Sequence, residues 1–261
     1  VNLLGREVQA KVWVLKVGRI SLYLLDTDID ENSWEDRALT HQLYGGDNEH
    51  RLKQEILLGI GGVRALEAIG LTPDIYHLNE GHASFLSLER LKNLIQHKGL
   101  SYPQAVEVVR SSSLFTTHTP VPAGHDHFPE HLVKNYLYPY AGDLGISWQE
   151  FMALGRVHAD NAGEDFNMSH LAIRLSQEVN GVSKLHGTVS QKMFTKLFPG
   201  YTADELHIGY VTNSVHYPTW IANDWHELYS KQFGDKFLRD QYNHDHWRKI
   251  NKVADEDIMG I

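Results

Sequence analysis

Residues 75–82, Ile75-Tyr76-His77-Leu78-Asn79-Glu80-Gly81-His82, are the stretch of sequence that decides the fold. A short apolar run ends in polar side chains, and a helical pattern of apolar residues follows over residues 85–94. The same order recurs at Leu114-Phe115-Thr116-Thr117, which runs directly into His118. Strands that alternate with helical segments indicate a parallel sheet that is covered by helices on both faces. We therefore predict an α/β fold with a mostly parallel sheet.

The first segments of the chain predict two strands and a helix. Val8, Ala10, Val12 and Val14 alternate with mostly polar residues, which indicates a half-buried strand, and a turn at Gly18-Arg19 leads to a second strand over residues 20–25. Apolar residues between positions 52 and 66 recur every three or four residues, which predicts an amphipathic helix. Asn48 is the expected cap of this helix, and Gly70 is its expected stop.

Helical patterns dominate the remainder of the chain. A helix is expected over residues 102–109, and helical patterns extend from His118 to about Phe198. Another short apolar run over residues 207–211 ends at Thr212-Asn213. Residues 218–261 again suggest helices. The stretch from Gly200 to Asn213 is the best candidate for a domain boundary.

Four of the predicted strands end in polar side chains of the kinds that bind ligands. These are Asp26 with Asp28, Asn79 with Glu80 and His82, His118, and Asn213. Ligands bind beyond the carboxyl ends of the strands in parallel sheets, where the loops gather. The pattern predicts that these groups share one cleft.

Composition excludes several functional classes. The 261 residues include no cysteine, which rules out disulfides, thiolate catalysis and cysteine-based zinc sites. A formal net charge of -9 argues against a nucleic-acid backbone binder, which would need a basic face. The apolar runs are too short for a membrane-spanning helix, and we expect no signal peptide.

The histidine-rich stretches and the glycine cluster have competing interpretations. His77 and His82 have the wrong spacing for a zinc protease, which needs both histidines on one helical face. The motifs His125-Asp126-His127 and His244-Asp245-His246 suit a chance metal site or, preferably, a solvated loop. Gly59, Gly61 and Gly62 lie inside a helical pattern and do not follow a strand, so we interpret them as close helix packing.

Three loops carry the candidate site residues. Tyr44-Gly45-Gly46-Asp47 indicates either a flexible loop with a carboxylate at its tip or a connector whose Asp47 caps the next helix. Pro120 and Pro122 stiffen the chain after His118, which suits a cleft edge, whereas the alternative is a core histidine with a satisfied hydrogen bond. Asn213 suits a sugar hydroxyl as well as it suits an Asx turn or a helix cap.

With these motifs in order, the chain resembles the glycogen (α-glucan) phosphorylases, in the shorter bacterial and archaeal form. The resemblance extends over nearly the whole chain. The matching motifs are Leu43-Tyr44-Gly45-Gly46-Asp47 followed by Arg51-Leu52-Lys53-Gln54-Glu55, Leu78-Asn79-Glu80-Gly81-His82, Thr116-Thr117-His118-Thr119, Asn167-Met168, Val179 to His186, and Thr212-Asn213 through Trp220.

The resemblance implies a retaining, reversible phosphorolysis of α-1,4-glucan or maltodextrin by phosphate, which releases glucose 1-phosphate. It also implies a glycosyltransferase-B fold, with residues 1–213 as the later part of the first domain and residues 214–261 as the crossover and first helices of the second. By position, His118 is the catalytic histidine beside the glucosyl unit, and Asn213 binds the same sugar. Asp47 lies in the loop that gates the site, and Glu80 and His82 lie near the cleft. The family is cytoplasmic and usually homodimeric, with no nucleic-acid or membrane partner.

Departures from the family pattern are as informative as the matches. The family cofactor is pyridoxal phosphate, but none of the lysines in this chain matches its Schiff-base lysine, and the family's glycine-rich loop is absent. We therefore expect an internal piece that does not turn over glucan alone. Two alternatives stay open: a nucleotide-sugar glucan synthase of the same fold, and a non-catalytic glucan-binding fragment.

Overall fold

The computed structural model describes residues 1–43 and 45–261, and these fall into two compact units, Val1–Thr212 and Asn213–Ile261. The strands of the first unit are β1 (Asn2–Leu3), β2 (Arg6–Glu7), β3 (Lys11–Val17), β4 (Ile20–Asp26), β5 (Tyr76–Asn79), β6 (Ser113–Thr117), β7 (His127–Phe128), β8 (Phe166–Asn167), β9 (Glu178–Gly181) and β10 (Ile208–Tyr210). Its α-helices are α1 (Trp34–Arg37), α2 (Asn48–Ile56), α3 (Gly62–Ala68), α4 (Leu86–Lys98), α5 (Tyr102–Ser111), α6 (Glu130–Leu144), α7 (Trp148–Ala153), α8 (Met168–Arg174) and α9 (Lys184–Phe194).

Short helices of other types complete both units. Those of the first unit are the π-helical segment η2 (Leu57–Gly61) and the 3₁₀ helices η1 (Ala38–Thr40), η3 (Gly81–Ala83), η4 (Pro122–Gly124), η5 (Thr195–Leu197) and η6 (Ala203–Glu205). The second unit is helical, as predicted, and contains α10 (Tyr217–Trp220), α11 (Asn223–Phe233), η7 (Asp235–Arg239), α12 (His244–Trp247), η8 (Arg248–Lys252) and α13 (Asp255–Met259). No helix in the described part of the chain is both long and apolar enough to span a bilayer.

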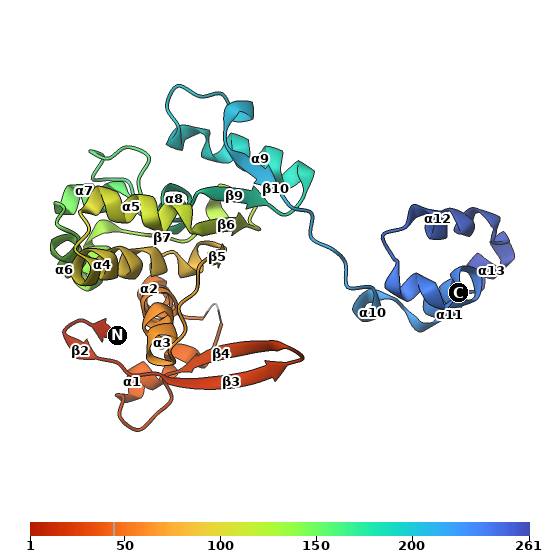
Figure 1. The fold of residues 1–261 in the computed structure, drawn as a ribbon, viewed down its shortest axis with the longest axis horizontal. Coiled ribbons are helices and arrows are strands. Elements are labelled where there is room, and N and C mark those ends of the chain that lie inside the picture. Colours follow the sequence, from red (N-terminus) through yellow and green to blue (C-terminus); the bar gives the residue numbers. More distant parts are fainter. Residues whose placement is uncertain (44) are drawn as a thin grey trace. The chain divides into compact units, whose positions relative to one another are not determined.

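A four-stranded parallel sheet in the order β10-β9-β6-β5 confirms the predicted fold class (Figure 1). Strand β9 was missed by the sequence analysis, because four residues that include Asn180 and Gly181 carry no clear strand pattern. One apolar row, Leu78, Phe115, Val179 and Ile208, crosses all four strands in register and packs against residues of α8 and α9. The carboxyl ends of these strands lie at one edge, so the sheet brings the loops after β5 and β6 together.

Among the described residues, the face of the sheet opposite this apolar row is only partly covered, whereas the sequence predicted helices on both faces. On the opposite face of the sheet, His77 and Glu178 are exposed and Leu114 is half-buried, whereas Thr116 and Asn180 are buried. The strands follow one another across the sheet in sequence order. Right-handed crossovers that all step in the same direction place their helices on one face, which explains the difference.

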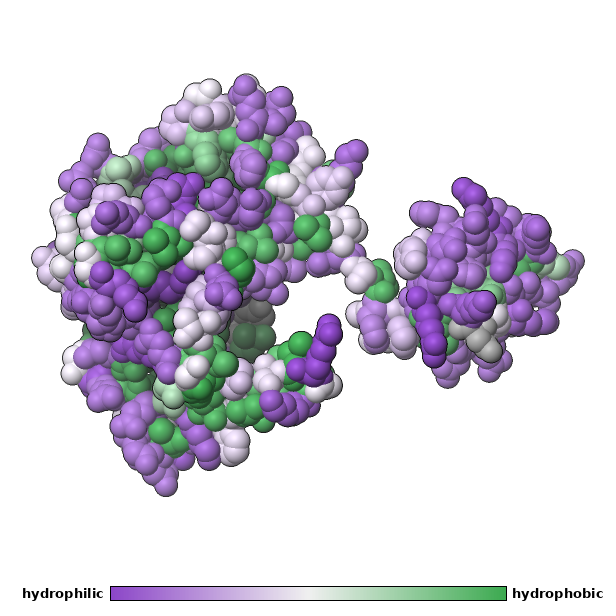
Figure 2. Space-filling view, in the orientation of Figure 1, coloured by the Kyte–Doolittle hydropathy of each residue, from purple (hydrophilic) through white to green (hydrophobic). Residues whose placement is uncertain are grey.

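The hairpin formed by β3 and β4 also differs from the prediction. The predicted strand over residues 8–14 lies at residues 11–17, and it pairs with β4 in a separate antiparallel sheet. The two strands are mostly exposed, not half-buried, and Figure 2 shows hydrophobic surface on this hairpin. One face consists of three cross-strand pairs of apolar side chains that are 42–54% exposed: Trp13 with Leu24, Leu15 with Leu22, and Val17 with Ile20.

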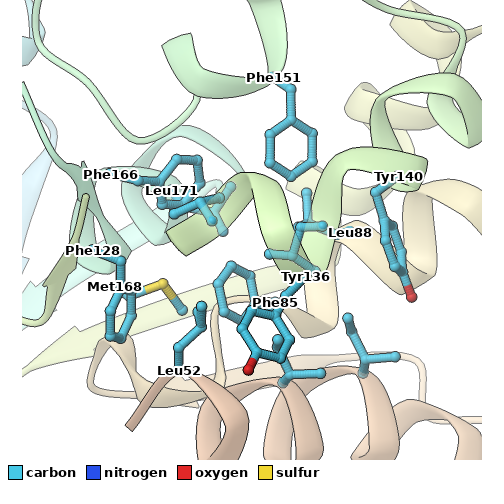
Figure 3. Close-up of a cluster of buried hydrophobic side chains, with 14 of the residues drawn as sticks. Leu52, Phe85, Leu88, Phe128, Tyr136, Tyr140, Phe151, Phe166, Met168 and Leu171 are labelled. Atoms are coloured by element: carbon cyan, nitrogen blue, oxygen red, sulfur yellow. The ribbon is translucent and has the colours of Figure 1, made fainter. Parts of the chain in front are cut away.

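The main core of the first unit lies among helices α2, α4, α6, α7 and α8. Its largest fully buried side chains include Leu52, Phe85, Phe151 and Phe166, which point toward one another in Figure 3. Phe85 begins the turn that leads from the loop after β5 into α4. The core therefore anchors the helix that follows the loop containing Glu80 and His82.

Candidate functional site

The loops after β5 and β6 meet through Glu80 and His118. The backbone N–H of Glu80 donates to the carbonyl of Thr116, 2.9 Å away, which continues the pairing of the two strands. The carboxylate of Glu80 accepts a hydrogen bond from the backbone N–H of His118 through Oε1, and the same oxygen accepts one from the hydroxyl of Thr119 at 3.0 Å. His118 is exposed, so it is not the core histidine that the sequence left as an alternative.

A charged cluster lies beside these loops and joins α2 to the segment after His118. Arg51 Nη2 donates to Asp126 Oδ2 at 2.9 Å, and His82 Nδ1 lies 2.9 Å from the same oxygen. Glu55 Oε1 is 3.3 Å from Arg51 Nη2 and 3.8 Å from His82 Nδ1. Glu55 is only 2% exposed, and its Oε2 atom has no hydrogen-bond partner among the described residues. We call these four residues the Arg51 cluster.

Burial and charge shift the pKa values in the Arg51 cluster in different directions. Burial raises the pKa of Glu55 to about 7. The hydrogen bond with Asp126 and the nearby carboxylate of Glu55 raise the pKa of His82 to about 9, so the ring is protonated at neutral pH. Burial opposes ionisation of Asp126, but the bonds from His82 and Arg51 prevail and hold its pKa well below the usual range. Protonated Nδ1 of His82 therefore donates to Asp126, as Arg51 does.

Three members of the Arg51 cluster have ligand atoms close enough together for a metal ion. These atoms of Glu55, His82 and Asp126 all lie within 4.8 Å of one another. However, Arg51 Nη2 lies within 3.3 Å of an atom of each of them. The guanidinium thus already supplies the positive charge at this position, and the donor set does not suit a second cation.

Arg51, Glu55 and Asp126 were not predicted from the sequence as parts of this site. Arg51 and Glu55 were quoted in a motif, and their four-residue spacing on a helix is a signal of side-chain contact. Asp126 lies 75 residues from Arg51, and nothing local indicates their contact. The expectation of a solvated loop at 125–127 was wrong for His125, which is 5% exposed and lies with Nδ1 2.7 Å from the hydroxyl of Ser169.

Asp47 is the N-cap of α2, in place of the predicted cap Asn48. Its carboxylate accepts from the backbone N–H of His50 at 2.9 Å, which lowers the pKa of Asp47. This confirms that the side chain caps the helix, and its role in a gating loop stays a prediction. Tyr44, in the same motif, lies outside the described residues.

The remaining predicted site residues are Asp26, Asp28 and Asn213, which belong to other segments of the chain than the loops that contain Glu80 and His118. Asp26 is the last residue of β4 and Asp28 follows it, and β4 is not a strand of the parallel sheet, so their strand does not bring them to the sheet's carboxyl edge with Glu80 and His118. Asp26 accepts from the indole of Trp13, and Asp28 pairs with Arg37. Asn213 is the first residue of the second unit, and its approach to His118 stays a prediction.

Comparison with known proteins shows what the chain is similar to. It is 46% identical over 257 residues to the glycogen phosphorylase of Mycobacterium tuberculosis, an alignment that covers 94% of this chain and 29% of that protein. It is 41% identical over 259 residues to the maltodextrin phosphorylase of Thermococcus litoralis, covering 99% of this chain and 30% of that protein. Both of these relatives are phosphorylases by name.

A third relative supports the same conclusion. The glycogen phosphorylase of Aquifex aeolicus is 38% identical over 261 residues, which are 99% of this chain and 37% of that protein. The resemblance deduced from the motifs is thus confirmed, and the chain spans about a third of the length of the curated relatives it matches. No protein-family model matches the chain.

Proposed function

We propose that this chain is part of an α-glucan phosphorylase, a glycosyltransferase that cleaves α-1,4-glucan or maltodextrin with phosphate and releases glucose 1-phosphate with retention. The similarity to phosphorylases over 94–99% of the chain carries the proposal. It also favours a phosphorylase over the nucleotide-sugar synthase. The homodimer and the cytoplasmic location that the resemblance implies belong to the same proposal.

In this proposal the carboxyl edge of the parallel sheet forms part of a sugar pocket. His118 bonds a hydroxyl of the reacting glucosyl unit and turns its carbonyl toward the electron-poor ring. A fixed dipole aimed at an oxocarbenium-like centre stabilises it without reorganisation. Asn213 binds the same sugar, Asp47 belongs to the gate, and Glu80 and His82 border the cleft. Closure of the gate would exclude water, so that phosphate attacks instead.

The residues of this chain do not fit pyridoxal phosphate, the cofactor that the family uses. A lysine that forms a Schiff base is typically activated by burial in an apolar pocket or by a neighbouring cation. No lysine in the described residues is buried. We therefore assign no residue here to the cofactor and expect no glucose 1-phosphate when this chain alone is incubated with maltodextrin and phosphate.

Titration with maltoheptaose, followed by calorimetry, tests the pocket directly. The wild-type chain is expected to bind, and His118→Ala is expected to weaken binding about tenfold or more, which corresponds to at least about 1.4 kcal/mol. His97→Ala, at an exposed position near the end of α4, serves as the control and should bind like wild type. Equal affinity of wild type and His118→Ala would instead indicate a surface site in a glucan-binding fragment, and absence of binding by wild type would contradict the pocket.

A further inference from the structure

The backbone of Glu80 adopts a conformation that is unusual for its residue type. Its φ and ψ angles are +67° and 175°, a combination that is essentially confined to glycine, and among the non-glycine residues of the described ranges only Leu4 shares a positive φ. Side chains with a Cβ disfavour this region, so the conformation persists only where the surroundings enforce it. Such strain gathers at functional sites, and Glu80 lies in the loop between β5 and η3, at the carboxyl edge of the sheet.

The contacts of Glu80 show what holds it there. Its backbone N–H is bonded to Thr116 O, so the residue remains attached to β6. Its side chain reaches the point where β6 ends, and Oε1 accepts from both the N–H of His118 and the hydroxyl of Thr119. Glu80 thus binds the chain before His118 through its backbone, and it binds His118 and Thr119 through its side chain.

We propose that Glu80 is a positioning residue for His118, which goes beyond its expected place near the sugar and rests on the proposed function. His118 is exposed, so packing does little to restrain it, and the bond from its N–H to Glu80 sets the plane of the preceding peptide. A fixed peptide plane restricts where the imidazole and the carbonyl of His118 point. Glu80 therefore acts on the sugar through His118.

The geometry provides a matched set of variants. Both bonds end on one oxygen, so the amide oxygen of Glu80→Gln can accept them, whereas Glu80→Ala removes the acceptor. Glu80→Gly also lacks the acceptor but adopts the positive φ without strain. Comparison of Ala with Gly therefore separates the backbone conformation from the carboxylate, and we expect the Gly variant to melt a few degrees above the Ala variant.

Backbone amide exchange of His118, measured by NMR on the full chain, is the first readout. Glu80→Ala and Glu80→Gly should raise this exchange rate about tenfold or more, while the amide of Phe115 within β6 stays protected and Glu80→Gln stays close to wild type. Unchanged exchange at His118 in the Ala and Gly variants would overturn the proposal. Equal loss of protection at Phe115 would also overturn it, because it would show general destabilisation of the sheet.

Maltoheptaose affinity is the second readout. Both variants without the acceptor should lose affinity about as much as His118→Ala, and Glu80→Gln should retain it. If His118→Ala weakens binding but Glu80→Ala does not, Glu80 does not position His118 for sugar. If the wild-type chain binds no maltoheptaose, the proposed function fails, while the exchange measurement still decides whether Glu80 holds His118.

Discussion

Gly59 occupies a position in η2 where a side chain would meet the start of α4. A Cβ atom there would lie 2.8 Å from the backbone nitrogen of Leu86 and 2.9 Å from Cβ of Phe85. We expect Gly59→Ala to lower the free energy of unfolding by about 1–3 kcal/mol, because neither the backbone nor the buried ring can move away freely.

Gly62, three residues further along the same continuous helical segment, provides the matched control. Apart from its chain neighbours and the backbone of its own helix, no atom lies within 4 Å of a Cβ built there, so Gly62→Ala should raise stability by about 0.5–1 kcal/mol through helix propensity alone. Urea denaturation of both variants checks the prediction. Similar stability changes in the two variants would show that the close approach at Gly59 has no energetic consequence.

Single residues were predicted well where their role is local. The interpretation of the glycine cluster as close packing is confirmed at Gly59, and the competing interpretations of Asp47 included the cap that it forms. His125 and Asp126 were misjudged because their partners, Ser169 and Arg51, are remote in the sequence. Their polar composition suggested that both side chains are exposed to solvent. Tertiary contacts instead bury His125 and pair Asp126 with Arg51.

At the scale of elements, the Arg51 cluster fastens α2 to the chain segment that follows β6. Arg51 lies one turn after the cap Asp47, and Asp126 follows His118 in the same connection. Glu55, from the next turn of α2, is buried against this pair with a pKa near 7. Helix α2, which follows the predicted gating loop, is thereby linked to the loop that contains the predicted catalytic residue His118.

The buried carboxyl of Glu55 makes stability depend on pH. Its pKa in the folded chain exceeds its ordinary value of 4.5, so the folded chain binds this proton more tightly than the unfolded chain does. The contribution is complete below pH 4.5 and is lost as pH rises toward 7. The raised pKa of His82 acts in the same direction, with its contribution lost as pH rises from 6.5 through 9.

Glu55→Gln replaces the ionisable carboxyl group with a neutral amide of nearly the same shape. From pH 4.5 to pH 8 its stability relative to wild type should rise, by about 3 kcal/mol at most. Urea midpoints across this range provide the measurement, and Glu67→Gln, at an exposed position on α3, is the control that should follow wild type. A constant difference between Glu55→Gln and wild type would show that Glu55 ionises as readily in the folded chain as in the unfolded chain.

Helices and strands were predicted from hydrophobic periodicity, and these predictions failed where the periodicity is ambiguous. β5, β6 and β10 were found because short apolar runs end in turns, and β9 was missed because it is short and contains Asn180 and Gly181. In the hairpin, apolar residues occupy both faces near Val14, so alternation does not indicate which face is buried. Among the described strands, β3 and β4 pair only with each other and do not join the parallel sheet. This depends on the rest of the fold, about which a local sequence pattern carries no information.

At the scale of the whole molecule, the order of the motifs revealed the relatives, and the contacts between loops came only with the structure. The first unit brings Glu80, His118 and the Arg51 cluster to one edge of the sheet, whereas Asn213 begins the second unit. We propose that His118 and Glu80, at this edge of the sheet, serve phosphorolysis. The chain spans about a third of the length of its relatives, so a test of this proposal requires a complete phosphorylase.

The most direct test replaces the matching segment of the Thermococcus litoralis maltodextrin phosphorylase with this chain and measures glucose 1-phosphate released from maltodextrin and phosphate. We expect the chimera to be active, and we expect His118→Ala within it to reduce the rate about 100-fold or more without lowering the melting temperature. A folded chimera that releases no glucose 1-phosphate, or one whose rate is unaffected by His118→Ala, would contradict the proposal.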